Sequence, residues 1–236
     1  MSNILVVHAH PEPKSFCTAL ATAAVEEFEA RGDTVVVSDL YAQKFNPVAS
    51  SDDFRSRANP DYLVYSLEQR NAQEHTSLGG DIKTEVDRVL AADTIVFVFP
   101  MFWFSTPAIL KGWIDRVFLS GTFYGGKRIY GRASMRGKKA VAAVTLGGRE
   151  HMFGVDALHG ELARGMMRHF FQGTLGYVGF DVIEPFFGYH VPYCSNDDRA
   201  GILENWRDHL RSLDRKPVMN MPDLSRFDDV FRPLEA

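Results

Sequence analysis

The segment that most constrains the fold is residues 94–118, TIVFVFPMFWFSTPAILKGWIDRVF. A continuous apolar run, residues 94–99, ends at Pro100 and is followed by four large apolar residues, 101–104. A Ser-Thr-Pro sequence at 105–107 then opens an amphipathic stretch. This order predicts a buried strand, an aromatic loop, and a helix over 107–119 with a proline in its first turn.

The rest of the chain repeats this alternation of strand and helix. We expect strands at 3–8, 34–38, 139–145 and 181–187, and helices at 16–31, 81–92 (capped by Asp81), 157–175 and 197–213 (capped by Asn196 or Asp197). The polar stretch 41–80 predicts only short helices near 51–56 and 61–74, and residues 120–137 predict a long loop. Five strands alternating with helices favour an α/β fold: one parallel sheet with helices on both faces. The sequence predicts one domain over 1–215 and an irregular, proline-containing tail over 216–236.

Global composition indicates an ordinary globular protein. The net charge is −4 and no long block of either sign occurs, which argues against nucleic acid as the main partner. No apolar run approaches the roughly 20 residues that span a bilayer, and the N-terminus does not read as a signal peptide. The only two cysteines, Cys17 and Cys194, provide neither a metal site nor a disulfide framework, so we expect a reduced, cytoplasmic protein.

The loop after the first strand joins it to the start of a helix. It reads His10-Pro-Glu-Pro-Lys14-Ser15-Phe16-Cys17 and contains neither a dinucleotide-binding glycine fingerprint nor a P-loop. Free backbone N–H groups at a helix start bind phosphate, and Ser15 can both cap the helix and donate to an anion. The alternatives are that Ser15 is only a cap, that His10 is a solvated loop residue, and that Cys17 is a small helix residue rather than a thiol with a lowered pKa.

Two further loops follow strands at the same sheet edge. Gly147 and Gly148 come directly after the fourth strand and would let the backbone approach a ligand, unless they only form a tight turn. The aromatic loop follows the third strand, and His159 lies at the expected start of a helix. In a flavodoxin-like strand order, 2-1-3-4-5, the loops after strands one, three and four converge. A phosphate-binding loop, a flat aromatic surface and a backbone that can approach the ligand closely together indicate a flavin. The alternative is that the aromatic residues simply pack in the core.

The sequence resembles the NAD(P)H:quinone oxidoreductases of the DT-diaphorase type in the flavodoxin-like superfamily. The resemblance covers roughly 3–215 and is carried by HAHPEPKSF, SDLYAQKFNP, FPMFWFSTPAILKGWIDRVF, the Thr-x-Gly-Gly…His-Gly run at 145–160 and GF-x-V-x-EP at 179–185. It implies a homodimer that binds FAD (FMN being possible) and reduces quinones, or other flat aromatic acceptors, with NADH or NADPH. It also implies a two-electron ping-pong cycle at an active site shared between the subunits.

The resemblance implies roles for individual positions. The cofactor would be held by His10, Ser15, Phe16, Cys17, Pro100, Met101, Phe102, Trp103, Phe104, Thr145, Leu146, Gly147, Gly148, Phe153, Val191 and Arg199. His159 and Tyr124 match catalytic positions of the family. Trp103, Phe104, Tyr124 and Tyr177 match its substrate pocket, with Tyr177 contributed across the dimer.

The chain departs from the family pattern at several positions. Phe153 stands where the animal enzymes have a tyrosine, and a phenyl ring cannot donate the hydrogen bond that the phenol gives. Gly126 replaces another pocket tyrosine, and Cys17 stands where asparagine is common. The longer C-terminal segment of the animal quinone reductase has no counterpart here, so NADH and NADPH remain open as donors.

Other functions are compatible with the same fold. A flavodoxin electron carrier would be shorter and more acidic. An azo- or nitro-reductase would use the same flavin, and some relatives are ancillary subunits of cation-efflux systems. Quinone reduction is the interpretation that the resemblance supports, although the sequence does not separate it from azo- or nitro-reduction, because both kinds of acceptor would take electrons at the same face.

Overall fold

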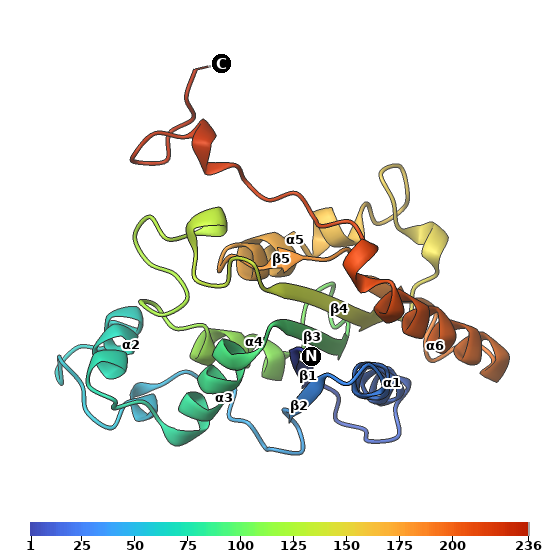
Figure 1. Ribbon diagram of the computed structural model, residues 1–236, viewed down its shortest axis with the longest axis horizontal. Helices are drawn as coiled ribbons and strands as arrows, with labels where there is room; N and C mark the ends of the chain where they lie inside the picture. Colours follow the sequence, from blue (N-terminus) through green and yellow to red (C-terminus); the bar gives the residue numbers. More distant parts are fainter. Residues whose placement is uncertain (236) are drawn as a thin grey trace.

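The computed structural model describes residues 1–235, and it is built around one parallel sheet (Figure 1). The strands are β1 (Asn3–His8), β2 (Thr34–Asp39), β3 (Thr94–Pro100), β4 (Lys139–Thr145) and β5 (Asp181–Val182). Their order is β2-β1-β3-β4-β5, as predicted, and β6 (Phe186–Gly188) also pairs with β4. The flavodoxin-like order therefore places the carboxyl ends of β1 and β3 side by side.

Helices cover both faces of this sheet. α1 (Phe16–Ala30) and α6 (Asn196–Arg211) cover one face, where they pack on residues such as Val6 and Val96. α3 (Gly80–Ala91), α4 (Ala108–Val117) and α5 (Arg168–Phe170) cover the other, against residues such as Val7 and Phe97. α2 (Tyr65–Glu74) lies against α4. Successive residues of a strand point to opposite faces of the sheet. Because helices cover both faces, an apolar run such as β3 is buried along its entire length.

Short helical turns complete the chain. Five are 3₁₀ turns: η1 (Ser51–Asp53), η2 (Tyr130–Arg132), η3 (Glu150–Met152), η6 (Leu213–Arg215) and η7 (Leu224–Arg226). Two are short π-helices, η4 (Leu162–Met166) and η5 (Phe171–Gly176).

Two predicted elements are wrong in detail. The helix expected at 157–175 begins at Leu162 and consists of η4, α5 and η5, because Gly160 takes a left-handed φ of 72° that ends a loop instead of starting a helix. The strand expected at 181–187 is split into β5 and β6, because Pro185 has no N–H to donate to a ladder. Between these halves the edge pairs with the tail: Glu184 N–H donates to the Pro217 carbonyl.

Helix starts also differ from the sequence expectation. Gly79 caps α3, so Asp81 lies in the first turn and its carboxylate accepts a hydrogen bond from Arg116. Pro107 precedes the first residue of α4, and Ser195 caps α6. The hydroxyl oxygen of Ser195 is a stronger cap because it accepts the Asp198 N–H in a reciprocal capping box.

The sequence around α4 serves mainly to hold the scaffold together. Arg116 is buried and donates to Asp53 at 2.7 Å and to Asp81 at 2.8 Å, while Trp113 donates to Glu85 at 2.9 Å. A Cβ at Gly112 would lie 2.0 Å from the backbone of the β2–η1 loop. These contacts fix α4, and hence the aromatic loop that precedes it.

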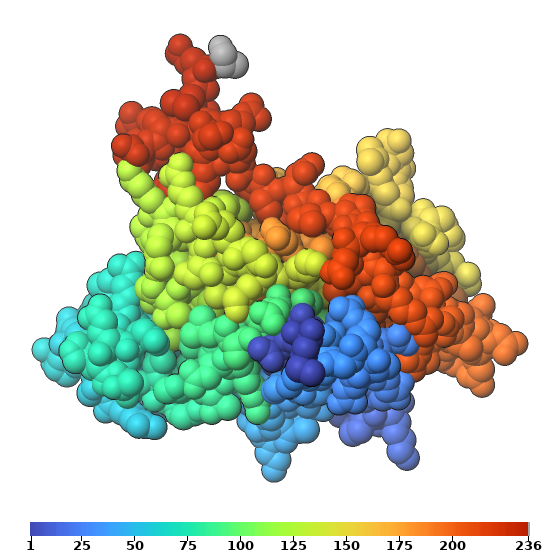
Figure 2. All heavy atoms as spheres, in the orientation of Figure 1, coloured from blue at the N-terminus to red at the C-terminus, as the bar shows by residue number. Residues whose placement is uncertain are grey.

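The tail is attached to the sheet and then leaves it. Met219 is buried in the core and Val218 forms a bridge with Ile183, so the start of the tail packs against the core. The later part of the tail projects from the body (Figure 2). Within residues 1–235 no helix has the length and apolar content needed to cross a membrane.

Candidate functional site

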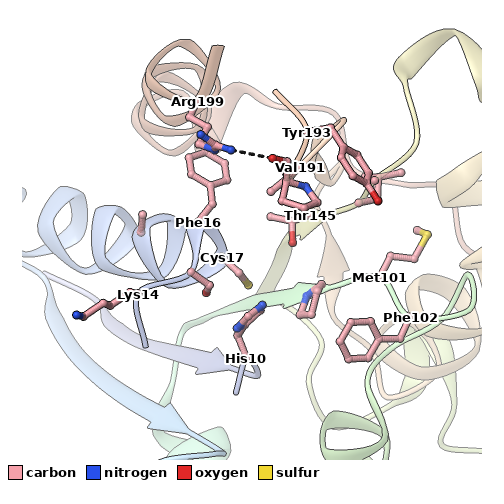
Figure 3. Close-up of a pocket in the computed structure, with 16 residues that line it drawn as sticks. His10, Lys14, Phe16, Cys17, Met101, Phe102, Thr145, Val191, Tyr193 and Arg199 are labelled. Carbon is pink, nitrogen blue, oxygen red and sulfur yellow. Dashed lines mark hydrogen bonds between the residues drawn. The ribbon is translucent and has the colours of Figure 1, made fainter. Parts of the chain in front are cut away.

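A cleft of about 750 Å³ opens at the carboxyl ends of β1, β3 and β4 (Figure 3). Its walls come from the β1–α1 loop, the end of β3, the β4–η3 loop and the loop after β6. A second cavity of about 290 Å³ continues it, since both are lined by Met101, Leu146 and Gly147. The three loops that the sequence singled out therefore meet in one continuous site.

The β1–α1 loop forms the end of the cleft that is suited to an anion, and we call it the anion-binding end. Ser15 caps α1, and its hydroxyl oxygen accepts the Thr18 N–H at 3.0 Å. Among the described residues the N–H groups of Phe16 and Cys17 have no acceptor, as expected at the first turn of a helix. The helix dipole adds positive potential at this end.

Two basic residues of the same loop line the cleft. His10 accepts the Glu12 N–H at its Nδ1, 3.0 Å away, so the neutral ring carries its proton on Nε2. Burial lowers the pKa of His10 below its ordinary value. Lys14 lines the cleft as well (Figure 3). The free N–H groups, the Ser15 hydroxyl and His10 therefore offer several donors to one anionic group, whereas the Lys14 side chain is directed away from them (Figure 3).

Cys17 is buried at the base of the cleft. Burial raises the pKa of its thiol to about 12, so the sulfur stays protonated at neutral pH. This excludes the lowered pKa that a helix start can cause, and leaves Cys17 as a small packing residue facing the cleft.

The aromatic loop is a tight hairpin turn. Phe102 and Ser105 exchange two backbone hydrogen bonds of 3.0 Å, and Trp103 and Phe104 between them have φ of 53° and 58°. Left-handed backbone at two bulky residues costs of order 1–2 kcal/mol each, and such strain concentrates at functional sites. The Ser105 hydroxyl pairs with His169 Nε2 at 3.0 Å and anchors the turn.

The turn presents its aromatic rings to the second cavity and not to the core. Trp103 is 97% exposed and Phe104 40% exposed, which rules out simple core packing for these two rings. His159 lies between Phe104 and Phe153, with ring centroids 5.3 and 5.2 Å away. His159 is therefore part of the cavity wall, although it belongs to a loop and not to a helix start.

The β4–η3 loop supplies the backbone wall. The N–H groups of Gly147 and Gly148 have no acceptor among the described residues, so both can donate to a bound molecule. A Cβ on Gly148 would lie 2.8 Å from the Phe153 ring, so glycine is required for Phe153 to pack here.

The loop after β6 closes the far end. The backbone of Val191 donates to the Leu146 carbonyl, and Arg199 donates to the Pro192 carbonyl at 2.8 Å (Figure 3). Tyr193 lies in the same loop as Val191 and also lines the cleft, but no motif in the sequence singled it out.

All residues assigned to cofactor binding thus line one of the two joined cavities. The larger holds His10, Ser15, Phe16, Cys17, Pro100, Met101, Phe102, Thr145, Leu146, Gly147, Val191 and Arg199. The smaller adds Trp103, Phe104, Gly148, Phe153 and His159.

Tyr124 and Tyr177 are not part of this site within one chain. Their rings lie 5.5 Å apart and line a separate cavity of about 360 Å³ beside α4 and η5. None of the residues lining that cavity lines the cleft or its extension.

Comparisons with known proteins agree with this architecture. A family model described as flavodoxin-like fold matches residues 2–211. The chain is 38% identical to mouse (Mus musculus) ribosyldihydronicotinamide dehydrogenase [quinone] over 211 residues, 89% of this chain and 91% of the relative. It is also 38% identical to guinea pig (Cavia porcellus) NAD(P)H dehydrogenase [quinone] 1 over 230 residues, 97% of this chain and 83% of the relative.

A solved structure agrees as well. A putative quinone reductase from Klebsiella pneumoniae superposes with a TM-score of 0.87 at 30% identity, covering 92% of this chain and 87% of that one. The chain therefore belongs to the flavodoxin-like family of NAD(P)H dehydrogenases (quinone), which are oxidoreductases.

Proposed function

We propose that this chain holds FAD in the cleft and reduces quinones with NAD(P)H in a two-electron ping-pong cycle. The observation that carries the proposal is the continuity of the site. An anion-binding helix start, a backbone wall and an exposed aromatic turn line two joined cavities of about 750 and 290 Å³.

The residues fit the parts of this cofactor. Its phosphates would meet the Phe16 and Cys17 N–H groups, His10 and Ser15. Its ring system would lie along the aromatic turn and the Gly147–Gly148 backbone. Its adenosine portion would reach Val191 and Arg199, which favours FAD over FMN because FMN lacks that portion. When bound, the flavin supplies the redox chemistry by taking a hydride from the nicotinamide and giving it to the quinone.

The protein positions the partners and tunes the local charge. Trp103 and Phe104 offer a flat wall on which a nicotinamide or a quinone can stack, and the same wall would serve both in turn. Phe153 has no polar atom, so the donors at this end are the His159 imidazole and the Gly147 and Gly148 N–H groups.

The proposed active unit is a homodimer. The exposure of Trp103 and the placement of Tyr124 and Tyr177 in a separate cavity support it, since a second copy could bring those tyrosines to the aromatic turn. We expect light scattering of the purified protein to give twice the mass of one chain. A monomer at micromolar concentration would contradict this assembly.

Steady-state kinetics test the proposed activity. With NADH or NADPH and a quinone both varied, we expect double-reciprocal plots with parallel lines, since the first product leaves before the quinone binds. An azo dye measured beside the quinone checks the acceptor, and we expect the quinone to be turned over faster. Intersecting lines would contradict the ping-pong cycle, and absence of quinone turnover would contradict the function.

A further inference from the structure

A row of hydrogen-bonding side chains runs behind the anion-binding end of the cleft. His8, at the end of β1, is 3% exposed and does not line the cleft. Its Nδ1 lies 3.4 Å from the Asp39 carboxylate at the end of β2. Its Nε2 lies 3.4 Å from the Thr18 hydroxyl, which lies 3.0 Å from the Ser15 hydroxyl. Ser15 does line the cleft, so the row connects a buried histidine to the site.

The direction of these hydrogen bonds depends on the proton count of His8. In the neutral ring the Asp39 carboxylate favours the proton on Nδ1, so Nε2 accepts from the Thr18 hydroxyl. The Thr18 oxygen then accepts the Ser15 hydroxyl proton. In this state Ser15 has no proton to offer to an anion in the cleft.

A second proton on the His8 ring reverses the direction of these hydrogen bonds. Both ring nitrogens then donate, and Nε2–H donates to the Thr18 oxygen. The Thr18 hydroxyl can turn to the Glu12 carbonyl, 3.1 Å away, and the Ser15 hydroxyl is free to donate into the cleft. The imidazolium also adds a positive charge close behind the helix start, where an anion would bind.

We infer that His8 is a positioning residue for the anion-binding end: the phosphates of the cofactor bind together with one proton taken from solvent by His8, and Thr18 relays that change so that Ser15 donates to the anion. The inference rests on the proposed function, because the anion is the diphosphate of FAD.

The charged surroundings of His8 agree with this role. β2 contributes Asp39, and the β1–α1 loop contributes His10, which interacts with His8 and with Glu12, while the neighbouring β3 carries no titratable side chain. Burial lowers the pKa of His8 below 6.5 against the opposing effect of Asp39, so the ring is neutral at pH 7 before an anion arrives. A bound anion favours the protonated ring and raises its pKa, so anion affinity should increase as pH falls and level off below the free-state pKa.

Titration of the full-length, flavin-free chain with FAD at pH 6 and pH 8 tests the inference. Because the diphosphate of FAD does not titrate in this range, a pH dependence reports on the protein. One linked proton changes affinity by at most tenfold per pH unit, which is at most about a hundredfold between pH 6 and pH 8. The dependence levels off below the free-state pKa of His8 and above its bound-state pKa, so we expect wild-type FAD binding to be about tenfold tighter at pH 6 than at pH 8. Riboflavin, which lacks phosphates, should change less than about twofold.

Three variants locate the linkage. His8→Gln keeps a neutral donor and Thr18→Val removes the relay, and both should bind FAD with less than about twofold change between the two pH values. His10→Gln is the matched control: it removes the other histidine, so it should weaken binding at both pH values and keep the wild-type pH dependence. Calorimetry in two buffers of different ionisation enthalpy should show proton uptake in wild type and His10→Gln, and none in His8→Gln.

The outcomes separate this inference from the proposed function. If wild type binds FAD and His8→Gln keeps the wild-type pH dependence, the inference is overturned but the proposed function stands. Loss of the pH dependence in His10→Gln but not in His8→Gln would assign the proton to His10 and also overturn it. A wild-type chain that binds no FAD at either pH would contradict the cofactor and the inference together.

Discussion

Replacing Trp103 by alanine and by glycine should separate the stability of the aromatic turn from its function. Trp103 has φ of 53°, and its side chain is 97% exposed. Both replacements remove the ring, so any contact that the ring makes, including one with a second copy, is lost equally. Only glycine relieves the left-handed backbone.

The expected magnitudes follow from that geometry. A left-handed residue costs about 1–2 kcal/mol unless it is glycine, and the extra freedom of glycine in the unfolded chain offsets about 0.5–1 kcal/mol. Trp103→Gly should therefore be about 1 kcal/mol more stable than Trp103→Ala, which corresponds to a melting temperature roughly 2–4 °C higher for a chain of this size. Both variants should lose about threefold to tenfold in kcat/KM for quinone, because one aromatic contact contributes about 0.5–1.5 kcal/mol.

Thermal unfolding by calorimetry and quinone turnover with NAD(P)H measure the two effects on the same samples. Equal melting temperatures for the two variants would refute the strained turn. Full activity in both would refute Trp103 as a wall of the substrate site, even if the stability difference is found.

Three further changes probe the site and the scaffold. His159→Gln should slow the reduction of bound flavin by NAD(P)H about tenfold in stopped-flow measurements, whereas Phe153→Tyr should be neutral or mildly activating; a wild-type rate in His159→Gln would exclude a catalytic role. Gly112→Ala should lower the free energy of unfolding in urea by about 3 kcal/mol, because the added Cβ would lie 2.0 Å from backbone. Gly131→Ala, whose Cβ would meet no atom of residues 1–235 within 4 Å, should unfold like wild type, and equal midpoints for the two variants would contradict the close packing of α4. Within residues 1–235, the buried His209 has no hydrogen-bond partner for Nε2, and burial lowers its pKa to about 4. Below pH 6.5 the unfolded chain therefore binds a proton at this residue, whereas the folded chain binds it only at about pH 4. Stability should fall by about 2 kcal/mol between pH 7 and pH 4.5, and a His209→Gln variant should lack this part of the decrease; an identical pH profile would show that His209 is not the group responsible.

Much of the fold could be predicted because its signals are local. The wholly apolar runs of β1, β3 and β4 identify buried strands, and helices between them leave few possible strand orders. The failures occur where a single residue overrides the pattern. Pro185 interrupts an otherwise strand-like run, and Gly160 takes a left-handed conformation where apolar spacing favoured a helix.

The candidate site was predictable to the extent that it follows strand ends. His10, Phe104 and Gly147 lie in loops directly after β1, β3 and β4, so the sheet order alone brings them together. Tyr193 lines the cleft from the loop after β6, but no motif in the sequence distinguishes it from an ordinary exposed loop tyrosine. Tyr124 lines another cavity, and it would reach the cleft only through the second copy of the chain that we propose.

The most direct test of the central claim is the visible spectrum of the purified protein during one redox cycle, followed by chromatography of the released cofactor. We expect a flavin spectrum that is bleached by NADH or NADPH without oxygen and restored by one equivalent of quinone, and about one FAD per chain on heat release. Release of FMN would contradict the adenosine contacts proposed for Val191 and Arg199. A colourless protein that gains no flavin on incubation with FAD would contradict the function assigned to the cleft.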